Sequence, residues 1–145
     1  MKEVFYLSKE EKIICFSLKD GTQSHGILEL YDEAPDDEEM VLIRTTIGEQ
    51  KLSFKEENYF EALKQLREHL EESQIQIQCN GAALNVYPSP MALSMGTGRL
   101  AYRLIHGKQA KTIDLVDIFD CNNDQSFVSI DEQANFYKDW LKSLS

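Results

Sequence analysis

Apolar and polar residues alternate along the first third of the chain, as expected for strands that bury one face. Ile14, Phe16 and Leu18 share one side before Asp20-Gly21, a dipeptide suited to a tight hairpin turn. The alternation returns in residues 27–31. These positions predict a first antiparallel hairpin.

A second hairpin is predicted after residue 40. Apolar side chains alternate from Met40 to Ile47, and Gly48-Glu49 can turn the chain into Lys51 to Phe54. The two hairpins together predict an antiparallel β-meander over residues 1–54.

Two later segments have the apolar spacing of helices. Ser53 and Glu56 fit a capping box, which predicts a helix over about 54–72. A second helix is predicted over about 131–144, capped by Ser129 or Asp131. The apolar faces of the two helices consist of Phe60, Leu63, Leu66 and Leu70, and of Phe136, Tyr137, Trp140, Leu141 and Leu144.

The segment between the helices mixes short strands with loops. Strands are predicted at Ile75–Cys79 and Leu100–Leu104, and one helical turn at Met91–Met95. Ile113–Phe119 is apolar but aperiodic; a strand is favoured there, although a short helix also fits. The order of elements predicts a single α+β domain over residues 1–145, in which two main helices cover a largely antiparallel sheet; residues 55–145 follow the meander.

Composition narrows the class of protein. The 145 residues are 42% hydrophobic and 28% charged, with a formal net charge of −10. Such a charge repels nucleic acid and anionic membranes, so neither is expected as a partner. No apolar run approaches the length of a membrane span or of a signal-peptide core. Three separated cysteines without a C-x-x-C pair indicate a reducing cytoplasm and no disulfides.

The charge is unevenly distributed along the chain. Residues 73–113 carry a net charge of +4 and contain no Asp or Glu. Loop residues with hydroxyl and backbone donors lie in the same segment, and such groups suit a carboxylate or phosphate. The segment therefore predicts an anion-binding site, although the glycines also fit plain turns. Its candidate residues are Asn80, Gly81, Tyr87, Ser89, Gly96, Thr97, Gly98, Arg99, Arg103 and His106.

An acidic run between the two predicted hairpins is the second candidate site. Most such runs are solvated hairpin ends, but this one also suits a basic protein partner, because opposite charge accelerates association. Its carboxylates are those of Asp32, Glu33, Asp36, Asp37, Glu38 and Glu39.

Known catalytic and cofactor patterns are absent or incomplete. Gly96-Thr97-Gly98-Arg99 lacks the third glycine of a dinucleotide site and the Gly-Lys of a phosphate loop. Cys79, in phase with Ile77, fits a buried thiol better than a nucleophile acting with His106. Residues 120–131 imitate a calcium loop without its glycine or its final glutamate, and an Asx-rich turn is favoured. We expect no metal and no cofactor.

The C-terminal half resembles a known family. The resemblance lies in Cys79-Asn80-Gly81-Ala82, Val86-Tyr87-Pro88-Ser89-Pro90-Met91, Met95-Gly96-Thr97-Gly98-Arg99, Leu115–Phe119 and Phe136-Tyr137…Trp140-Leu141. These residues resemble a family of small uncharacterised bacterial proteins over residues 75–145, and residues 1–50 resemble nothing known to us. The resemblance implies a bacterial origin and assigns no activity or site.

Two hypotheses follow. The first is a non-enzymatic, acidic cytoplasmic module that docks a macromolecular partner, for example an immunity-type inhibitor that binds a basic toxin. The alternative is a small-molecule site or enzyme in segment 73–113, where Arg99 and Arg103 hold an anion and His106 moves a proton.

Overall fold

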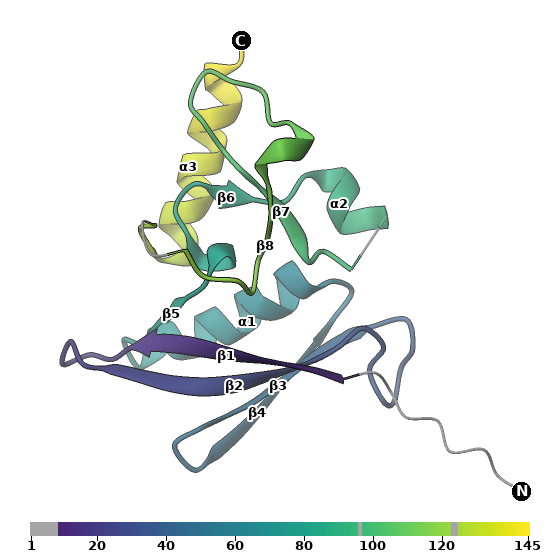
Figure 1. The fold of residues 1–145 in the computed structure, drawn as a ribbon, viewed down its shortest axis with the longest axis vertical. Helices are drawn as coiled ribbons and strands as arrows, with labels where there is room; N and C mark the ends of the chain where they lie inside the picture. The colour runs from purple at the N-terminus through teal and green to yellow at the C-terminus, as the bar shows by residue number, and fades with distance from the viewer. Residues whose placement is uncertain (1–8, 96, 123–124) are drawn as a thin grey trace, which may run out of the picture.

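The computed structural model describes residues 9–95, 97–122 and 125–145, which form two antiparallel sheets and three helices (Figure 1). The larger sheet has the strand order β4-β3-β2-β1-β5, and the smaller one the order β6-β7-β8. The strands are β1 (Lys9–Ser17), β2 (Gln23–Tyr31), β3 (Val41–Ile47), β4 (Gln50–Glu56), β5 (Gln76–Gln78), β6 (Val86–Tyr87), β7 (Leu100–Arg103) and β8 (Leu115–Asp117). The helices are α1 (Tyr59–Glu72), α2 (Pro90–Met95) and α3 (Ile130–Ser143), with 3-10 turns η1 (Asn80–Ala82) and η2 (Thr112–Asp114). The predicted single α+β domain is confirmed.

The predicted meander is present with the predicted turns. β1 pairs with β2 from Lys9↔Tyr31 to Ser17↔Gln23, and Gly21 adopts a positive φ of 87° in the connecting turn. β3 and β4 are joined through Gly48, whose φ is 62°. Both turns need the left-handed backbone that glycine adopts without a Cβ clash.

The predicted start of the first helix is wrong. β4 continues to Glu56, with Ser53 paired to Arg44, and the helix begins only at Tyr59. Asn58 is the true N-cap, since its Oδ1 accepts a 2.9 Å hydrogen bond from the Glu61 amide. Residues 53–56 pair with β3 as a strand, so the capping box that their sequence allows does not form.

Other boundaries shift by smaller amounts. The strand after α1 is limited to Gln76–Gln78, and β7 ends at Arg103. The ambiguous segment 113–119 contains a 3-10 turn and then β8, so the preferred strand is correct only for Leu115–Asp117. α3 begins at Ile130, and of the two predicted caps, Ser129 and Asp131, it is Ser129 that caps the helix, in a capping box with Glu132.

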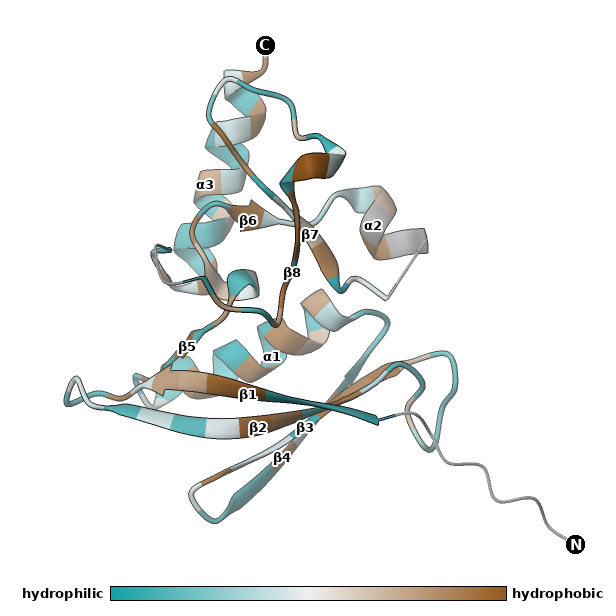
Figure 2. Cartoon of the chain, viewed as in Figure 1, coloured by the Kyte–Doolittle hydropathy of each residue, from teal (hydrophilic) through white to brown (hydrophobic). Residues whose placement is uncertain are grey.

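One core joins the two sheets. Tyr59, Leu63 and Leu66 of α1 are fully buried, and the core around them includes Ile43 of the larger sheet and Ile118 beyond β8. Figure 2 shows apolar residues in brown along β1 and β8, on either side of α1. α1 therefore lies between the two sheets. Within the described residues, no helix or strand covers the opposite face of the five-stranded sheet in Figure 1.

A buried arginine crosses this core. Arg67 of α1 is only 1% exposed, and burial lowers the pKa of its guanidinium. Nη1 donates to Gln133 Oε1 (2.6 Å) and to the Gly81 carbonyl (3.2 Å), and Nη2 donates to the Val128 carbonyl (2.8 Å). Among the described residues no carboxylate forms an ion pair with it. The charge is held by neutral oxygens from three separate segments.

Gln133 of α3 completes this network. Its Nε2 donates to the carbonyl oxygens of Gly81, Ala83 and Val86 at 2.8 to 2.9 Å, while its Oε1 receives Arg67. Gln133 itself is 2% exposed, so no water replaces these bonds when they are lost.

Gln133→Leu is expected to lower the free energy of unfolding by about 2–4 kcal/mol, because it removes three hydrogen bonds to buried carbonyls and one of the three acceptors of the buried Arg67 guanidinium. Urea denaturation followed by circular dichroism measures the loss. Gln65→Leu, on the outer side of α1, is the matched control and is expected to change stability by less than about 0.5 kcal/mol. Equal effects of the two substitutions would contradict the assigned role of Gln133.

Candidate functional site

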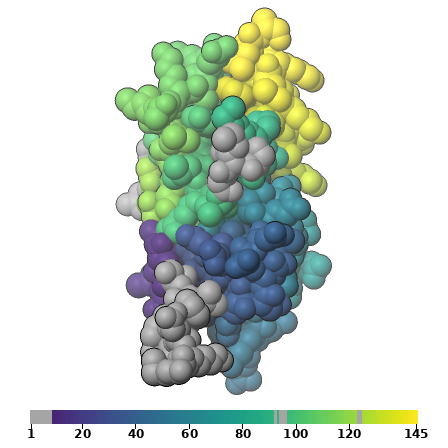
Figure 3. Space-filling model, turned by 90° about the vertical axis from the view of Figure 1, so that its right-hand side faces the viewer, coloured from purple at the N-terminus to yellow at the C-terminus, as the bar shows by residue number. Residues whose placement is uncertain are grey.

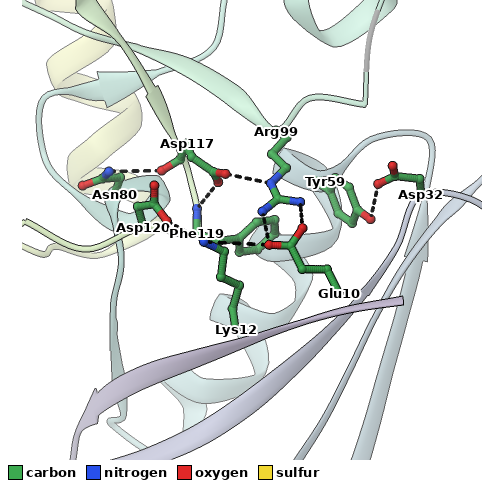
Figure 4. Close-up of polar contacts among 9 residues, drawn as sticks. All are labelled: Glu10, Lys12, Asp32, Tyr59, Asn80, Arg99, Asp117, Phe119 and Asp120. Atoms are coloured by element: carbon green, nitrogen blue, oxygen red, sulfur yellow. Dashed lines mark hydrogen bonds and ion pairs between the residues drawn. The ribbon is translucent and has the colours of Figure 1, made fainter. Parts of the chain in front are cut away.

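Arg99 lies in a cluster of charged residues between β1 and the C-terminal half of the chain (Figure 4). Its Nη1 and Nη2 donate to the two carboxylate oxygens of Glu10 at 2.6 and 2.9 Å, and its Nε donates to Asp117 Oδ2 at 2.8 Å. The guanidinium also lies 5.7 Å from the ring centroid of Phe119. The hydrogen bond to Glu10 is the largest cause of the raised pKa of Arg99.

A second cation, Lys12, extends this group of charged residues. We call the group the junction cluster; it consists of Glu10, Lys12, Arg99, Asp117 and Asp120. Lys12 Nζ lies 2.7 Å from Asp120 Oδ1. Asp117 Oδ1 accepts the Phe119 amide at 2.9 Å, so both of its oxygens are used. The cluster holds three carboxylates against two cations, and it fastens β1 to β8. Its arginine has its donors directed at carboxylates within the protein.

Four more of the predicted anion-site residues are built into the fold. Asn80 is 1% exposed and donates from Nδ2 to the Asp117 carbonyl, and Gly81 packs against Ile118. The Thr97 carbonyl accepts the Tyr59 amide at 2.6 Å. Gly98 has a φ of 74°, and a Cβ there would lie 2.7 Å from Asn58 Cβ. Gly96 lies outside the described residues.

Tyr87 and Ser89 line a different hollow, which we call the aromatic hollow. It measures about 310 Å³ and is also lined by Tyr102, Tyr137 and Trp140. The rings of Tyr87 and Tyr137 stack with their centroids 4.2 Å apart. The Trp140 ring is fixed, because its Nε1 donates to the carbonyls of Ile105 and Lys108.

Arg103 and His106 are also brought together by the structure, in a second hollow. They line a hollow of about 460 Å³, which we call the Arg103 hollow, with the polar residues Asn85, Gln125 and Ser126. The nine predicted residues that the structure describes are thus divided among the interior of the fold, the junction cluster and two hollows. Arg99 and Arg103 do not share a hollow, and anion binding stays a prediction.

The acidic run forms an ordered loop between β2 and β3. The Ala34 amide donates to the Met40 carbonyl and the Asp37 amide to the Ala34 carbonyl, and the buried Ala34 side chain packs with Tyr31 and Leu42. This loop lies on the face that Figure 3 presents to the viewer.

The six carboxylates of the loop differ in what they contact. Asp32 accepts the Tyr59 hydroxyl at 2.7 Å, and Asp36 pairs with Lys55 at 3.0 Å. Asp37 accepts the Glu39 amide within the loop. The three remaining carboxylates, those of Glu33, Glu38 and Glu39, are exposed and form no ion pair within the described residues.

The sequence did not reveal the uncovered face of the larger sheet. Ile13 and Ile27, directly paired across β1 and β2, point outward and are 76% and 48% exposed. Ile27 lines a hollow of about 1030 Å³, which also reaches Pro35 and Asp36 of the acidic loop. We call this surface, comprising Ile13, Ile27 and the lining of that hollow, the open face. Its signal in the sequence is Ile13, an apolar residue on the polar side of the alternation.

The chemistry of the remaining candidates is limited by burial. Cys79 is fully buried, and burial raises the pKa of its thiol to about 12, whereas His106 is exposed.

Asp120 of the calcium-like segment bonds to Lys12, and residues 123 and 124 lie outside the described residues. In the described part of the chain no three metal-ligating side chains are grouped to hold an ion. No described helix has the length and apolarity needed to span a membrane.

No known family model matches the chain, and no curated protein matches it. The resemblance of residues 75–145 to a family of small bacterial proteins therefore stays a prediction.

The junction cluster makes the free energy of unfolding depend on pH in the acidic range. Glu10 has a pKa below its ordinary value of 4.5, chiefly because Arg99 donates to its carboxylate. A lowered pKa stabilises the fold above the ordinary value, and this contribution is lost as the pH falls through the value in the folded protein.

Glu10→Gln is therefore expected to lower the free energy of unfolding at pH 7 by about 0.5–1 kcal/mol, a modest loss because the carboxylate is half exposed. The difference from the unmodified protein should shrink as the pH falls from about 5 to about 2. Denaturant titrations at several pH values measure it. Glu11→Gln, on the opposite side of β1, is the control; a pH-independent loss at position 10 would refute the assigned contribution of the carboxylate.

Proposed function

We propose that this protein is a non-enzymatic cytoplasmic module that docks a basic protein partner on the open face and the adjoining acidic loop. The observation that carries the proposal is the outward-facing pair Ile13 and Ile27, 76% and 48% exposed, beside a hollow whose rim includes Asp36 of the loop. An immunity-type inhibitor of a basic toxin is one function that such a surface serves.

The apolar part of the open face supports a protein partner. Two isoleucines paired across neighbouring strands form a contiguous apolar patch, and Leu42 lies in the lining of the hollow beside them. Protein interfaces bury such apolar centres and surround them with polar residues. Here the surrounding residues are polar or charged, among them Glu11, Glu29 and Arg44. The partner is therefore expected to present an apolar residue at the centre of its contact surface.

The acidic loop supports a basic partner. Glu33, Glu38 and Glu39 have no ion pair to break within the described residues, so their charge is available without the loss of a bond in the fold. The whole chain carries a net charge of −10, which attracts a cationic protein at long range. Charges at the rim of an interface mainly raise the association rate.

The proposal is tested by affinity capture from the cells that make the protein, at low salt and at about 0.3 M salt, where charges are screened within a few ångströms. A stoichiometric basic protein is expected at low salt. Ile27→Asp should abolish its capture by placing an unpaired charge in the apolar centre of the contact. Recovery of no stoichiometric partner, or equal recovery with Ile27→Asp, would overturn the proposal.

Charge reversal of the loop separates its contribution from that of the sheet. The triple variant Glu33→Lys, Glu38→Lys, Glu39→Lys is expected to slow association with the captured partner at least about tenfold at low salt and much less at high salt. Surface plasmon resonance measures the rates. The control variant reverses three exposed acids elsewhere, Glu68, Glu72 and Asp139, so that the net charge is matched. Equal slowing by both variants would show that the loop is not in the contact.

A further inference from the structure

We infer that the Arg103 hollow binds a small carboxylate that carries an apolar body. The hollow lies against β7 and α3, and none of its lining residues lines the hollow of the open face. This inference is therefore independent of the proposed docking function.

The first observation is an arginine without an acceptor. Of the four arginines in the chain, Arg44 contacts Glu29 and the Tyr31 hydroxyl, Arg67 is held by carbonyls and Gln133, and Arg99 is held by two carboxylates. The side chain of Arg103 forms no hydrogen bond or ion pair with any described residue, and its Nε is buried without a partner.

A buried donor without an acceptor destabilises the fold, and a ligand that accepts from it removes that cost. A guanidinium matches a carboxylate through two parallel hydrogen bonds.

The second observation is the uncharged polar wall beside Arg103. Both side-chain polar atoms of Gln125, Nε2 and Oε1, are buried and have no partner in the part of the chain that the structure describes. Asn85, Ser126 and His106 also line the hollow, and no described lining residue is a carboxylate. Although the chain has a net charge of −10, no carboxylate among the described lining residues neutralises the Arg103 guanidinium or repels an anionic ligand.

The remaining walls define the body of the ligand. They are apolar and consist of Leu84, Leu104, Ile105 and Phe136. The volume of about 460 Å³ lies within the range of roughly 300–1,000 Å³ that small-molecule pockets occupy. An inorganic anion would leave these apolar walls in contact with water, whereas a carboxylate on a hydrocarbon or aromatic body uses both kinds of wall. Phenylacetate has the size and the chemistry to serve as the probe.

The test compares three ligands on the unmodified protein by titration in ¹H–¹⁵N NMR spectra: phenylacetate, the uncharged phenylacetamide and inorganic phosphate. Phenylacetate is expected to bind saturably, with shifts concentrated at the residues that line the hollow. Phenylacetamide and phosphate are each expected to bind at least about tenfold more weakly, since one lacks the charge and the other the apolar body. Equal binding of the amide, tighter binding of phosphate, or no saturable binding of phenylacetate would overturn the inference.

Two variants remove the same charge from different places. Arg103→Gln is expected to weaken phenylacetate binding at least about tenfold, because the charge-assisted hydrogen bonds are lost. Lys108→Gln removes a positive charge from the same segment, but its side chain lies outside the hollow, and binding should stay within about twofold. The spectra also report whether each variant is folded. An equal loss of phenylacetate binding in both variants would show that only the net charge of the protein matters, and it would overturn the assignment of Arg103.

Discussion

The position of Arg67 constrains the rest of the structure more than any other single interaction. A guanidinium that is 1% exposed and has no carboxylate partner among the described residues must be surrounded by neutral acceptors. Those acceptors come from the turn at Gly81, from Val128 and from Gln133 of α3, so one side chain of α1 fixes three distant segments at once. The walls of the Arg103 hollow depend on the same arrangement, because Phe136 follows Gln133 on α3.

The junction cluster explains where the positive charge of the acid-free segment goes. Arg99 and the carboxylates of Glu10 and Asp117 are far apart in sequence, yet the fold joins them in hydrogen bonds of 2.6 to 2.9 Å. Their mutual attraction holds the five-stranded sheet against the C-terminal half. The cluster uses the charge of Arg99 for assembly, whereas the side chain of Arg103, four residues further on, has no acceptor among the described residues and lines a hollow. Arg99 and Arg103, which belong to one segment of the sequence, therefore lie in different environments.

Local patterns predicted the elements and failed where tertiary contacts compete with them. The alternation around Ile14 and Phe16 and the glycines at turns predicted the meander, since both are local properties of the backbone. The capping box at Ser53 failed because residues 53–56 pair with β3 as a strand. Of the candidate site, the sequence found Arg103 and His106 but missed Asn85 and Gln125, which reach the hollow only through the packing of separate loops.

By itself the sequence determined the class of fold, the acidic character of the molecule and the two segments in which its charge is concentrated, because periodicity and composition are readable without coordinates. Only the tertiary structure decided which charged side chains form ion pairs and which do not. Ion pairing depends on distances of a few ångströms between residues that are up to 108 positions apart, as for Lys12 and Asp120. It also decided that no described helix covers one face of the larger sheet, because α1, α2 and α3 pack elsewhere and leave Ile13 and Ile27 exposed.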